Sequence, residues 1–226
     1  MGKESLDLSC FNIAGQAIVN SKSEKMEVES AKCIRLTDEK AKYCKISFKA
    51  EAKNAGGYLL INDQYDIPVN SVSIMEIKTP IELHVKLVVS AESELQVEEL
   101  SFEPLEEYED LVEKCDVTNN VLVVTPNYPS SSNLYHCAFA HSRNREYKSA
   151  GVNLQVASIS AYNWFETLYT IDGISVFKGT YESLKRLLST RRYKVTVTHF
   201  VDEHLFSIYD GYTYPWDRMV FICHGP

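Results

Sequence analysis

The sequence predicts two successive domains, an all-β domain and then an α/β domain with a doubly wound parallel sheet. Over residues 6–102, apolar and polar side chains alternate with a period of two, as they do in strands that bury one face. The apolar run VLVV at residues 121–124 then opens a segment in which strands alternate with helices. A chain of 226 residues is long enough for two domains of ordinary size.

The first domain, over residues 1–105, is predicted to be an antiparallel β-sandwich. Apolar and polar residues alternate strictly in the segments 44–50 and 81–87. Glycine, proline and Asn-Asp pairs recur at short intervals and supply turns, and no helical pattern lies between them. The pair Glu98-Glu99 breaks the alternation around it, which predicts a β-bulge.

Residues 106–119 are predicted to be an acidic linker that contains a short helix. Six of its side chains are acidic and one is basic. Apolar residues recur in and next to it at three- and four-residue spacing, as on one face of a helix: Leu105, Tyr108, Leu111 and Val112. We therefore expect the boundary between the domains to lie in this segment.

The second domain, over residues 120–226, is predicted to open with a strand, a polar loop and a helix. The VLVV run is too short for a helix and is closed by Pro126 and Pro129, so we expect a strand that is buried on both faces. The polar residues 130–133 offer N-caps for a helix over residues 134–149. This unit starts the parallel sheet.

The remaining residues continue the alternation of strands and helices. Gly151 is the residue expected just after the first helix. Asp172-Gly173 lies between two apolar runs and predicts a two-residue hairpin, and Thr180 predicts the cap of the next helix. We expect strands over residues 152–159, 167–171, 174–177, 193–200 and 218–223, and helices over residues 180–192 and 202–209.

Three polar clusters follow predicted parallel strands and are expected to meet at one edge of the sheet: residues 127–133, His199, and His224-Gly225. Ligands of doubly wound sheets bind outside the carboxyl ends of the strands. Free backbone N–H groups near Ser132 and Asn133 offer a place for a hydroxyl, carboxylate or phosphate group, unless these residues only cap the helix. His199 is a candidate ligand-binding residue or, alternatively, a hydrogen-bonded histidine of the core.

Two further features bear on the chemistry at this edge. Gly225 lets a substrate approach the backbone closely. Asp202 or Glu203 is a candidate base, although acidic residues at the start of a helix also have local reasons to be there. Residues 120–226 carry eight acidic and ten basic side chains, a net charge of +2 in a chain of −8, which suits an anionic ligand or an ordinary solvated surface.

Several classes of function are disfavoured. The chain contains no GxSxG, GxxxxGK[ST], GxGxxG or HExxH motif. Its six cysteines and six histidines lack metal-ligand spacing, so we expect reduced thiols and no metal site. The pair Arg191-Arg192 is explained by its place at a helix end, so nucleic acid is not an expected partner. Without an apolar run of about 18 residues or a signal sequence, we expect a cytoplasmic chain.

The second domain resembles a known family. The segments VLVVTPNYPSSSNLYHCAFAHSRNREYKSAGVNLQVASIS, TLYTIDGISVFKG, YKVTVTHF and VFICHGP look like the N-terminal, acceptor-side half of bacterial GT-B glycosyltransferases of the family 4 type. The resemblance is carried by the P-x-Y-P loop, by the F-x-H-x-R helix at Phe139, His141 and Arg143, and by the final His-Gly. Many relatives have a glycine pair where this chain has residues 130–132. The resemblance implies a Rossmann-like domain.

It also implies an activity for the full-length enzyme, which would transfer a sugar from a nucleotide-diphosphate sugar with retention, without a metal. His224 would lie near the transferred sugar and hold a hydroxyl group or support the transition state. The acceptor, a glycan or lipid-linked molecule, would be lined or flanked by Asn127, Tyr128, Ser131, Ser132, Asn133, His199 and Gly225.

The resemblance further implies that a second domain holds most of the nucleotide-sugar donor. This chain ends at Pro226 before such a domain, so it looks like a truncated piece that is inactive alone. The resemblance implies that the full-length enzyme acts in polysaccharide biosynthesis. It is also consistent with peripheral association of that enzyme with a membrane.

A non-catalytic function is the alternative. The first domain has a weaker resemblance to the jelly-roll or carbohydrate-binding-like sandwiches that precede some of these enzymes. It would then bind a glycan or a protein, with the α/β domain as a docking scaffold or as an inactive regulatory subunit. Tyr58 and Tyr65 are candidates for stacking on a sugar, or for the core.

Overall fold

The computed structural model describes residues 4–5, 17–18, 26–53, 57–89, 94–116, 118–210 and 218–222. The protein is predominantly β, with antiparallel and mixed sheets. The chain divides into two compact units, Met1–Glu109 with Ser130–Leu134 and Asp110–Pro129 with Tyr135–Pro226. The boundary therefore lies inside the acidic segment, and a short piece of the loop expected in the second domain belongs to the first unit.

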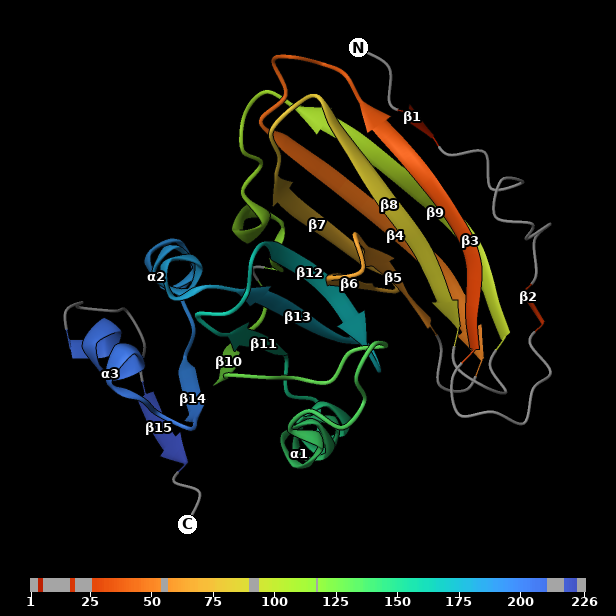
Figure 1. Cartoon of the computed structure of the whole chain (residues 1–226). Coiled ribbons are helices and arrows are strands. Elements are labelled where there is room, and N and C mark those ends of the chain that lie inside the picture. Colours follow the sequence, from red (N-terminus) through yellow and green to blue (C-terminus); the bar gives the residue numbers. More distant parts are fainter. Residues whose placement is uncertain are drawn as a thin grey trace. The chain divides into compact units, whose positions relative to one another are not determined.

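The first unit contains two antiparallel sheets that lie face to face (Figure 1). One sheet has the order β1-β9-β4-β7, with β2 on β9, and the other has the order β3-β8-β5-β6. The strands are β1 (Glu4–Ser5), β2 (Ala17–Ile18), β3 (Met26–Leu36), β4 (Tyr43–Lys53), β5 (Gly57–Ile61), β6 (Tyr65–Pro68), β7 (Ser71–Glu76), β8 (Ile81–Val89) and β9 (Glu94–Leu105). The predicted antiparallel pairing is thus confirmed.

Side-chain alternation explains why these strands stack. In β4, Cys44, Ile46 and Phe48 are fully buried, while the residues between them point to the other face. The register of β4 with β9 moves from Lys49↔Glu99 to Ala50↔Val97, so Glu98 has no opposite residue. This is the bulge that the Glu98-Glu99 pair predicts.

The second unit is built on a sheet with the order β12-β13-β11-β10-β14-β15. Its strands are β10 (Val121–Thr125), β11 (Leu154–Ile159), β12 (Glu166–Ile171), β13 (Ile174–Gly179), β14 (Val195–His199) and β15 (Arg218–Ile222). All neighbours are parallel except the β12-β13 hairpin. Numbered along the chain without β12, the parallel strands lie in the order 3-2-1-4-5.

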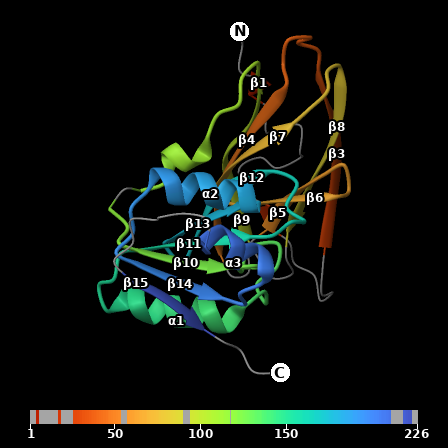
Figure 2. The ribbon, with the colours of Figure 1, turned by 90° about the vertical axis from the view of Figure 1, so that its left-hand side faces the viewer.

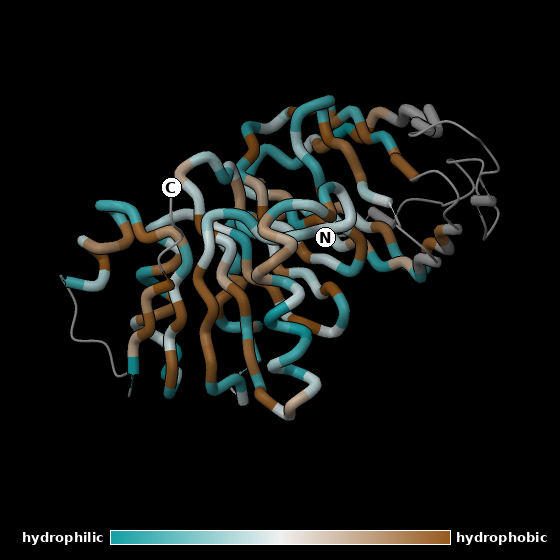
Figure 3. Tube along the Cα trace, turned by 90° about the horizontal axis from the view of Figure 1, so that it is seen from below, coloured by the Kyte–Doolittle hydropathy of each residue, from teal (hydrophilic) through white to brown (hydrophobic). Residues whose placement is uncertain are grey.

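Helices cover both faces of this sheet. Figure 2 shows α1 (Ala138–Ser149) on one face, and α2 (Tyr181–Thr190) with its neighbour α3 (Glu203–Asp210) on the other. Hydrophobic residues are concentrated along the strands (Figure 3), and residues 122–124 of the central strand β10 are completely buried. No helix in the described ranges is long and apolar enough to cross a membrane.

The first helix starts later than the sequence predicts. It begins at Ala138 rather than near residue 134, and its N-cap is Cys137, which has φ +44° and makes no side-chain cap. The serines predicted to cap it are engaged elsewhere in the first unit. The Val69 N–H donates to Ser131 Oγ at 3.0 Å, and the Ser132 hydroxyl donates to Asp66. These partners lie about 60 residues away in the sequence, which is why the cap prediction was wrong.

Other local predictions are confirmed. Gly151 has φ +84° and follows α1, with its N–H donated to the Lys148 carbonyl at 2.9 Å. Asp172 and Gly173 have φ values of +49° and +70° between β12 and β13, as a tight hairpin turn requires. Thr180 caps α2 in a reciprocal pair with Ser183. Each of these features depends on residues close together in the chain.

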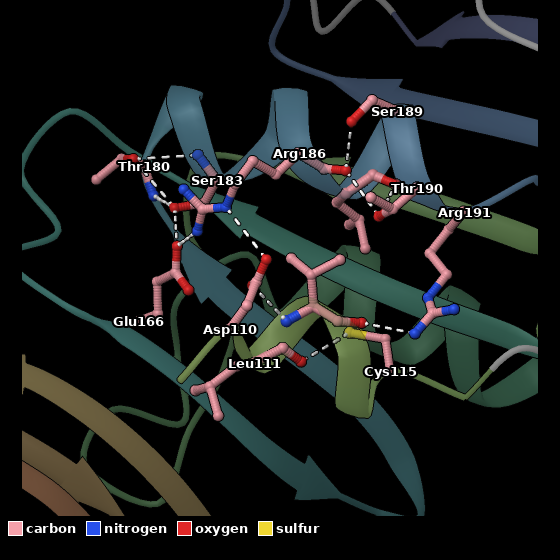
Figure 4. Close-up of polar contacts among 12 residues, drawn as sticks. Asp110, Leu111, Cys115, Glu166, Thr180, Ser183, Arg186, Ser189, Thr190 and Arg191 are labelled. Atoms are coloured by element: carbon pink, nitrogen blue, oxygen red, sulfur yellow. Dashed lines mark hydrogen bonds and ion pairs between the residues drawn. The ribbon is translucent and has the colours of Figure 1, made fainter. Parts of the chain in front are cut away.

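Polar contacts attach the acidic segment to α2 (Figure 4). Glu166 of β12 is 6% exposed and accepts hydrogen bonds from Ser183 Oγ, at 2.5 Å, and from Arg186. The Arg186 guanidinium also lies 3.5 Å from Asp110. Asp110 caps the 3-10 helix η2 (Leu111–Lys114), so Arg186 joins η2, α2 and β12.

Arg191 makes a second attachment at the other end of α2. Its Nη2 donates to the Val112 carbonyl at 3.1 Å and to the Glu113 carbonyl at 2.8 Å. A cation at the carbonyl end of a helix is favourable. The second half of the predicted linker, beginning at Asp110, is therefore an attached part of the second unit.

Removing the Arg186 guanidinium should destabilise the second unit. In Arg186→Met, the buried Glu166 carboxylate loses its counter-charge, and we expect the free energy of unfolding to fall by about 2 kcal/mol. Lys185→Met is the matched control, because its ion pair with Glu182 is exposed and should contribute less than about 0.5 kcal/mol. Urea denaturation measures both. Equal effects of the two substitutions would contradict the role given to Arg186.

Candidate functional site

The parallel strands of the second unit all end at one edge of the sheet, here called the carboxyl edge. Their last residues are Thr125, Ile159, Gly179, His199 and Ile222. From β10 the chain continues to β11, which pairs with one edge of β10. It later returns to β14, which pairs with the other edge of β10. This reversal of strand order next to β10 is where doubly wound sheets bind their ligands.

Two of the predicted acceptor residues follow β10 directly, but only one of them is exposed. Asn127 is exposed, and its carbonyl oxygen accepts a hydrogen bond from the Thr125 hydroxyl at 3.2 Å. Tyr128, predicted to line the acceptor side, is instead 4% exposed and packs in the core. Its hydroxyl accepts from Asn144 Nδ2 at 3.1 Å and lies 2.9 Å from His141 Nδ1. Tyr128 is therefore a structural residue.

His141 extends this contact to the hairpin. Its Nε2 lies 3.1 Å from Asp172, which also approaches Arg145. The histidine of the F-x-H-x-R helix thus connects the loop after β10, through Tyr128, with the β12-β13 turn. These contacts give His141 a structural role.

Five other predicted residues belong to the first unit or lie outside the described residues. Ser131, Ser132 and Asn133 belong to the first unit, where the Ser130 and Asn133 backbones bond to each other and the Ser131 and Ser132 hydroxyls bond to β6 and the residue after it. His224 and Gly225 lie outside the described residues. The predicted meeting of the three clusters at one edge therefore stays a prediction.

His199 lies at the carboxyl edge, close to Phe139 and next to Phe200 in the sequence. It is 1% exposed, and its ring centroid is 5.9 Å from that of Phe139 at the start of α1. The Phe139 ring in turn lies 6.0 Å from the ring of Phe200. This burial favours the core alternative for His199, with Phe139 and Phe200 forming the exposed layer above it.

The backbone at this edge is strained. Six non-glycine residues in the described chain have positive φ, and four of them are Asn or Asp, which tolerate that conformation. The other two are Cys137, at +44°, and Phe200, at +54°, and both lie in connections that leave the carboxyl edge. Strain of this kind, costing on the order of 1–3 kcal/mol per residue, is concentrated at functional sites.

The loops after β11, β13 and β14 meet at the same edge. Asn163, after β11, donates its Nδ2 to the Gly179 carbonyl at the end of β13, at 2.8 Å. Tyr181, the first residue of α2, donates its hydroxyl to Asp202 Oδ2 at 2.5 Å, and its ring centroid lies 5.3 Å from that of His204 with the two rings tilted by 41°. We call the following residues the three-loop cluster: Ser160, Tyr162, Asn163, Trp164, Tyr181, Asp202 and His204.

Burial and hydrogen bonds set the protonation states of Tyr181 and Asp202. Burial raises the pKa of the Tyr181 hydroxyl to about 12, and the bond to Asp202 and the nearby Tyr162 add to the effect. Burial disfavours the Asp202 carboxylate, but hydrogen bonds from Tyr181 and from the Leu205 N–H outweigh it and lower the pKa of Asp202. At neutral pH, Asp202 is an ionised acceptor and Tyr181 a neutral donor.

The cluster can bind a ligand that offers hydroxyl groups and an apolar face. Asp202 supplies a charged acceptor, while Tyr162 and Trp164 are 88% and 75% exposed. The sequence had singled out Asp202 but missed Tyr162, Trp164 and Tyr181. The signal that could have found them is their place directly after predicted parallel strands, the same rule that selected the loop after β10.

The described cysteines and carboxylates do not assemble a metal site. Within the described residues, no group of three or more His, Cys, Asp or Glu side chains is placed to hold a metal ion. Cys44 and Cys115 are buried free thiols, and burial raises the pKa of both, that of Cys44 to about 12. Cys33 is an exposed free thiol and Cys137 a half-buried one.

The protein thus combines an antiparallel β unit with a second unit in which helices cover a mixed sheet. No family model matches the sequence, and no curated protein matches it. A chain of the glycosylation-associated protein (Gap123) complex from Streptococcus agalactiae aligns with 74% of this chain, at 11% sequence identity and a TM-score of 0.23. The alignment spans 61% of that neighbour. A score this low does not show a shared fold.

The Tyr181–Asp202 bond can be tested by titration. In Tyr181→Phe the carboxylate loses its strongest donor, so the pKa of Asp202 should rise toward the ordinary value for aspartate. Because the pKa is lowered in the folded state, the bond's contribution is present above the ordinary pKa and lost as the pH falls through the lowered one. NMR titration of the Asp202 carboxyl carbon measures the shift.

Tyr162→Phe is the matched control, since it removes a tyrosine hydroxyl from the same cluster but keeps the donor to Asp202. It should leave the Asp202 titration nearly unchanged. If Asp202 titrates at the same pH in the wild type and in Tyr181→Phe, the hydrogen bond does not set its charge.

Proposed function

We propose that the second unit is the acceptor-side, Rossmann-like half of a GT-B glycosyltransferase, and that its acceptor binds at the carboxyl edge. One observation carries this proposal. The Tyr181–Asp202 hydrogen bond joins the loops after β13 and β14 at the edge of a sheet ordered 3-2-1-4-5. Polar groups that follow different strands meet there, at the edge along which this type of sheet binds ligands.

In this proposal the enzyme transfers a sugar from a nucleotide-diphosphate sugar to a glycan or lipid-linked acceptor, with retention and without a metal. A second domain, in the same or another polypeptide, holds the donor. Asp202 keeps acceptor capacity for hydroxyl groups of the acceptor, because its carboxylate offers about four lone-pair sites and three donors approach it, the Tyr181 hydroxyl and the Leu205 and His204 N–H groups. His224 and Gly225 keep the roles near the transferred sugar that the family resemblance implies.

The acceptor-side residues are revised accordingly. Asn127 remains, since it is exposed directly after β10. Tyr128 is withdrawn because it is buried, and His199 supports the exposed ring of Phe139 rather than contacting the acceptor. The first unit, a jelly-roll or carbohydrate-binding-like sandwich in this proposal, contributes contact with a glycan or protein.

A second candidate is a non-catalytic glycan- or protein-binding protein, with the α/β unit as a regulatory scaffold. One observation favours it. Ser131 and Ser132, which would line the acceptor side of an enzyme, have their hydroxyls engaged within the first unit, with the residue after β6 and with Asp66. A loop fixed in this way serves the architecture of the chain rather than a substrate.

One titration separates the two candidates. We expect that adding maltotriose, cellotriose or chitotriose to the ¹⁵N-labelled chain shifts the backbone amides of Tyr162, Tyr181 and Asp202, since the acceptor binds at the carboxyl edge. Uridine diphosphate should shift few amides, and the chain alone should not turn over a nucleotide-sugar.

Amide shifts confined to strands of the first unit would favour the non-catalytic candidate. Appreciable turnover by the chain alone would contradict the assignment of donor binding to a second domain.

A further inference from the structure

Two aromatic side chains of the three-loop cluster face the solvent from one short turn. Tyr162 is 88% exposed and Trp164 is 75% exposed, and Asn163 lies between them in the sequence. Single exposed aromatic residues are ordinary, but here two lie two residues apart in one turn, and Tyr162 is near enough to Tyr181 to contribute to the raised pKa of its hydroxyl. Such a surface at a ligand-binding edge calls for a ligand with an apolar face.

The turn that presents them is rigidly held. The Ser160 N–H donates to the Gly179 carbonyl at 3.1 Å, and Asn163 Nδ2 donates to the same oxygen at 2.8 Å. Within the turn, the Tyr162 N–H bonds to Ser160 Oγ at 3.2 Å and the Asn163 N–H to the Ser160 carbonyl at 3.2 Å. The backbone that carries the two aromatic residues is therefore held before any ligand arrives, which lowers the entropic cost of ordering this turn on binding.

The charges around the turn select against phosphate. Asp202 is ionised, and Glu203 lies in the first turn of α3, whereas Glu182 of α2 is paired with Lys185 at 2.6 Å. The carboxylates of Asp202 and Glu203 repel a nucleotide or nucleic acid, which would otherwise stack on the same rings. A pyranose is neutral, has an apolar face of C–H groups, and carries hydroxyl groups on its rim that donate to carboxylates.

We infer that Tyr162 and Trp164 form a stacking platform for one pyranose unit of a neutral glycan, with Asp202 accepting hydrogen bonds from its hydroxyls. This inference rests on the proposed function and deepens it, since it names the part of the acceptor that this edge recognises. Asn163 is a positioning residue, because its side chain ties the turn to Gly179.

Trp164 itself reports on the contact. The chain has two tryptophans, so Trp216→Phe leaves Trp164 as the single fluorescent indole. In this variant, maltotriose, cellotriose or chitotriose should shift the emission to shorter wavelength and reduce quenching by acrylamide, because a sugar ring covers the indole. Uridine monophosphate at the same concentration should leave the emission unchanged.

Substitutions in the same background then locate the platform. Tyr162→Ala should weaken binding about tenfold through the loss of one stacking surface. Tyr147→Ala is the matched control: this tyrosine is 39% exposed on α1, near the opposite end of the sheet, and its loss should leave the affinity unchanged. Circular dichroism of each variant confirms that it is folded.

The outcomes are distinguishable. If the trisaccharides shift amides at the carboxyl edge while the Trp164 emission and the Tyr162→Ala affinity stay unchanged, the platform is overturned and the proposed function stands. An emission change with uridine monophosphate alone also overturns the platform. If none of the trisaccharides perturbs an amide of the second unit, the platform and the proposed acceptor site fail together.

Discussion

Parallel pairing of β10 on both of its edges is the constraint on which the second unit depends. Val123 is paired with Val156 of β11 on one side and with Val197 of β14 on the other. The side chains of residues 122–124 are fully buried, so the helices must cover both faces of this strand. Each buried aliphatic side chain contributes about 1.5–3 kcal/mol, which makes any other register or position of β10 costly.

This constraint also decides where chemistry can occur. Because the strands around β10 are parallel, their following loops all emerge at the carboxyl edge, where Cys137 and Phe200 adopt left-handed conformations and Tyr181 reaches Asp202. The strands provide a rigid frame, and the loops carry exposed rings and a carboxylate that the core does not need. These groups are the basis of the ligand binding that we propose for this edge.

Features set by neighbouring residues could be predicted from the sequence, and features set by distant partners could not. The Asp172-Gly173 hairpin, the Thr180 cap and the bulge at Glu98 each follow from local turn or strand chemistry. The serines before α1 have the right residue type for a cap, but Asp66 and Val69 engage them instead. For the site, the carboxyl edge was predictable from the alternation of strands and helices, whereas the burial of Tyr128 depends on Asn144 and His141.

The central claim is that β10 lies between β11 and β14, and cross-strand nuclear Overhauser effects test it most directly. The account predicts that Val123 shows contacts with both Val156 and Val197 in the folded chain. Contacts of Val123 with Val156 but not with Val197 would place β14 elsewhere in the sheet. The loops after β11, β13 and β14 would then have no common edge, and the account of the binding site would be contradicted.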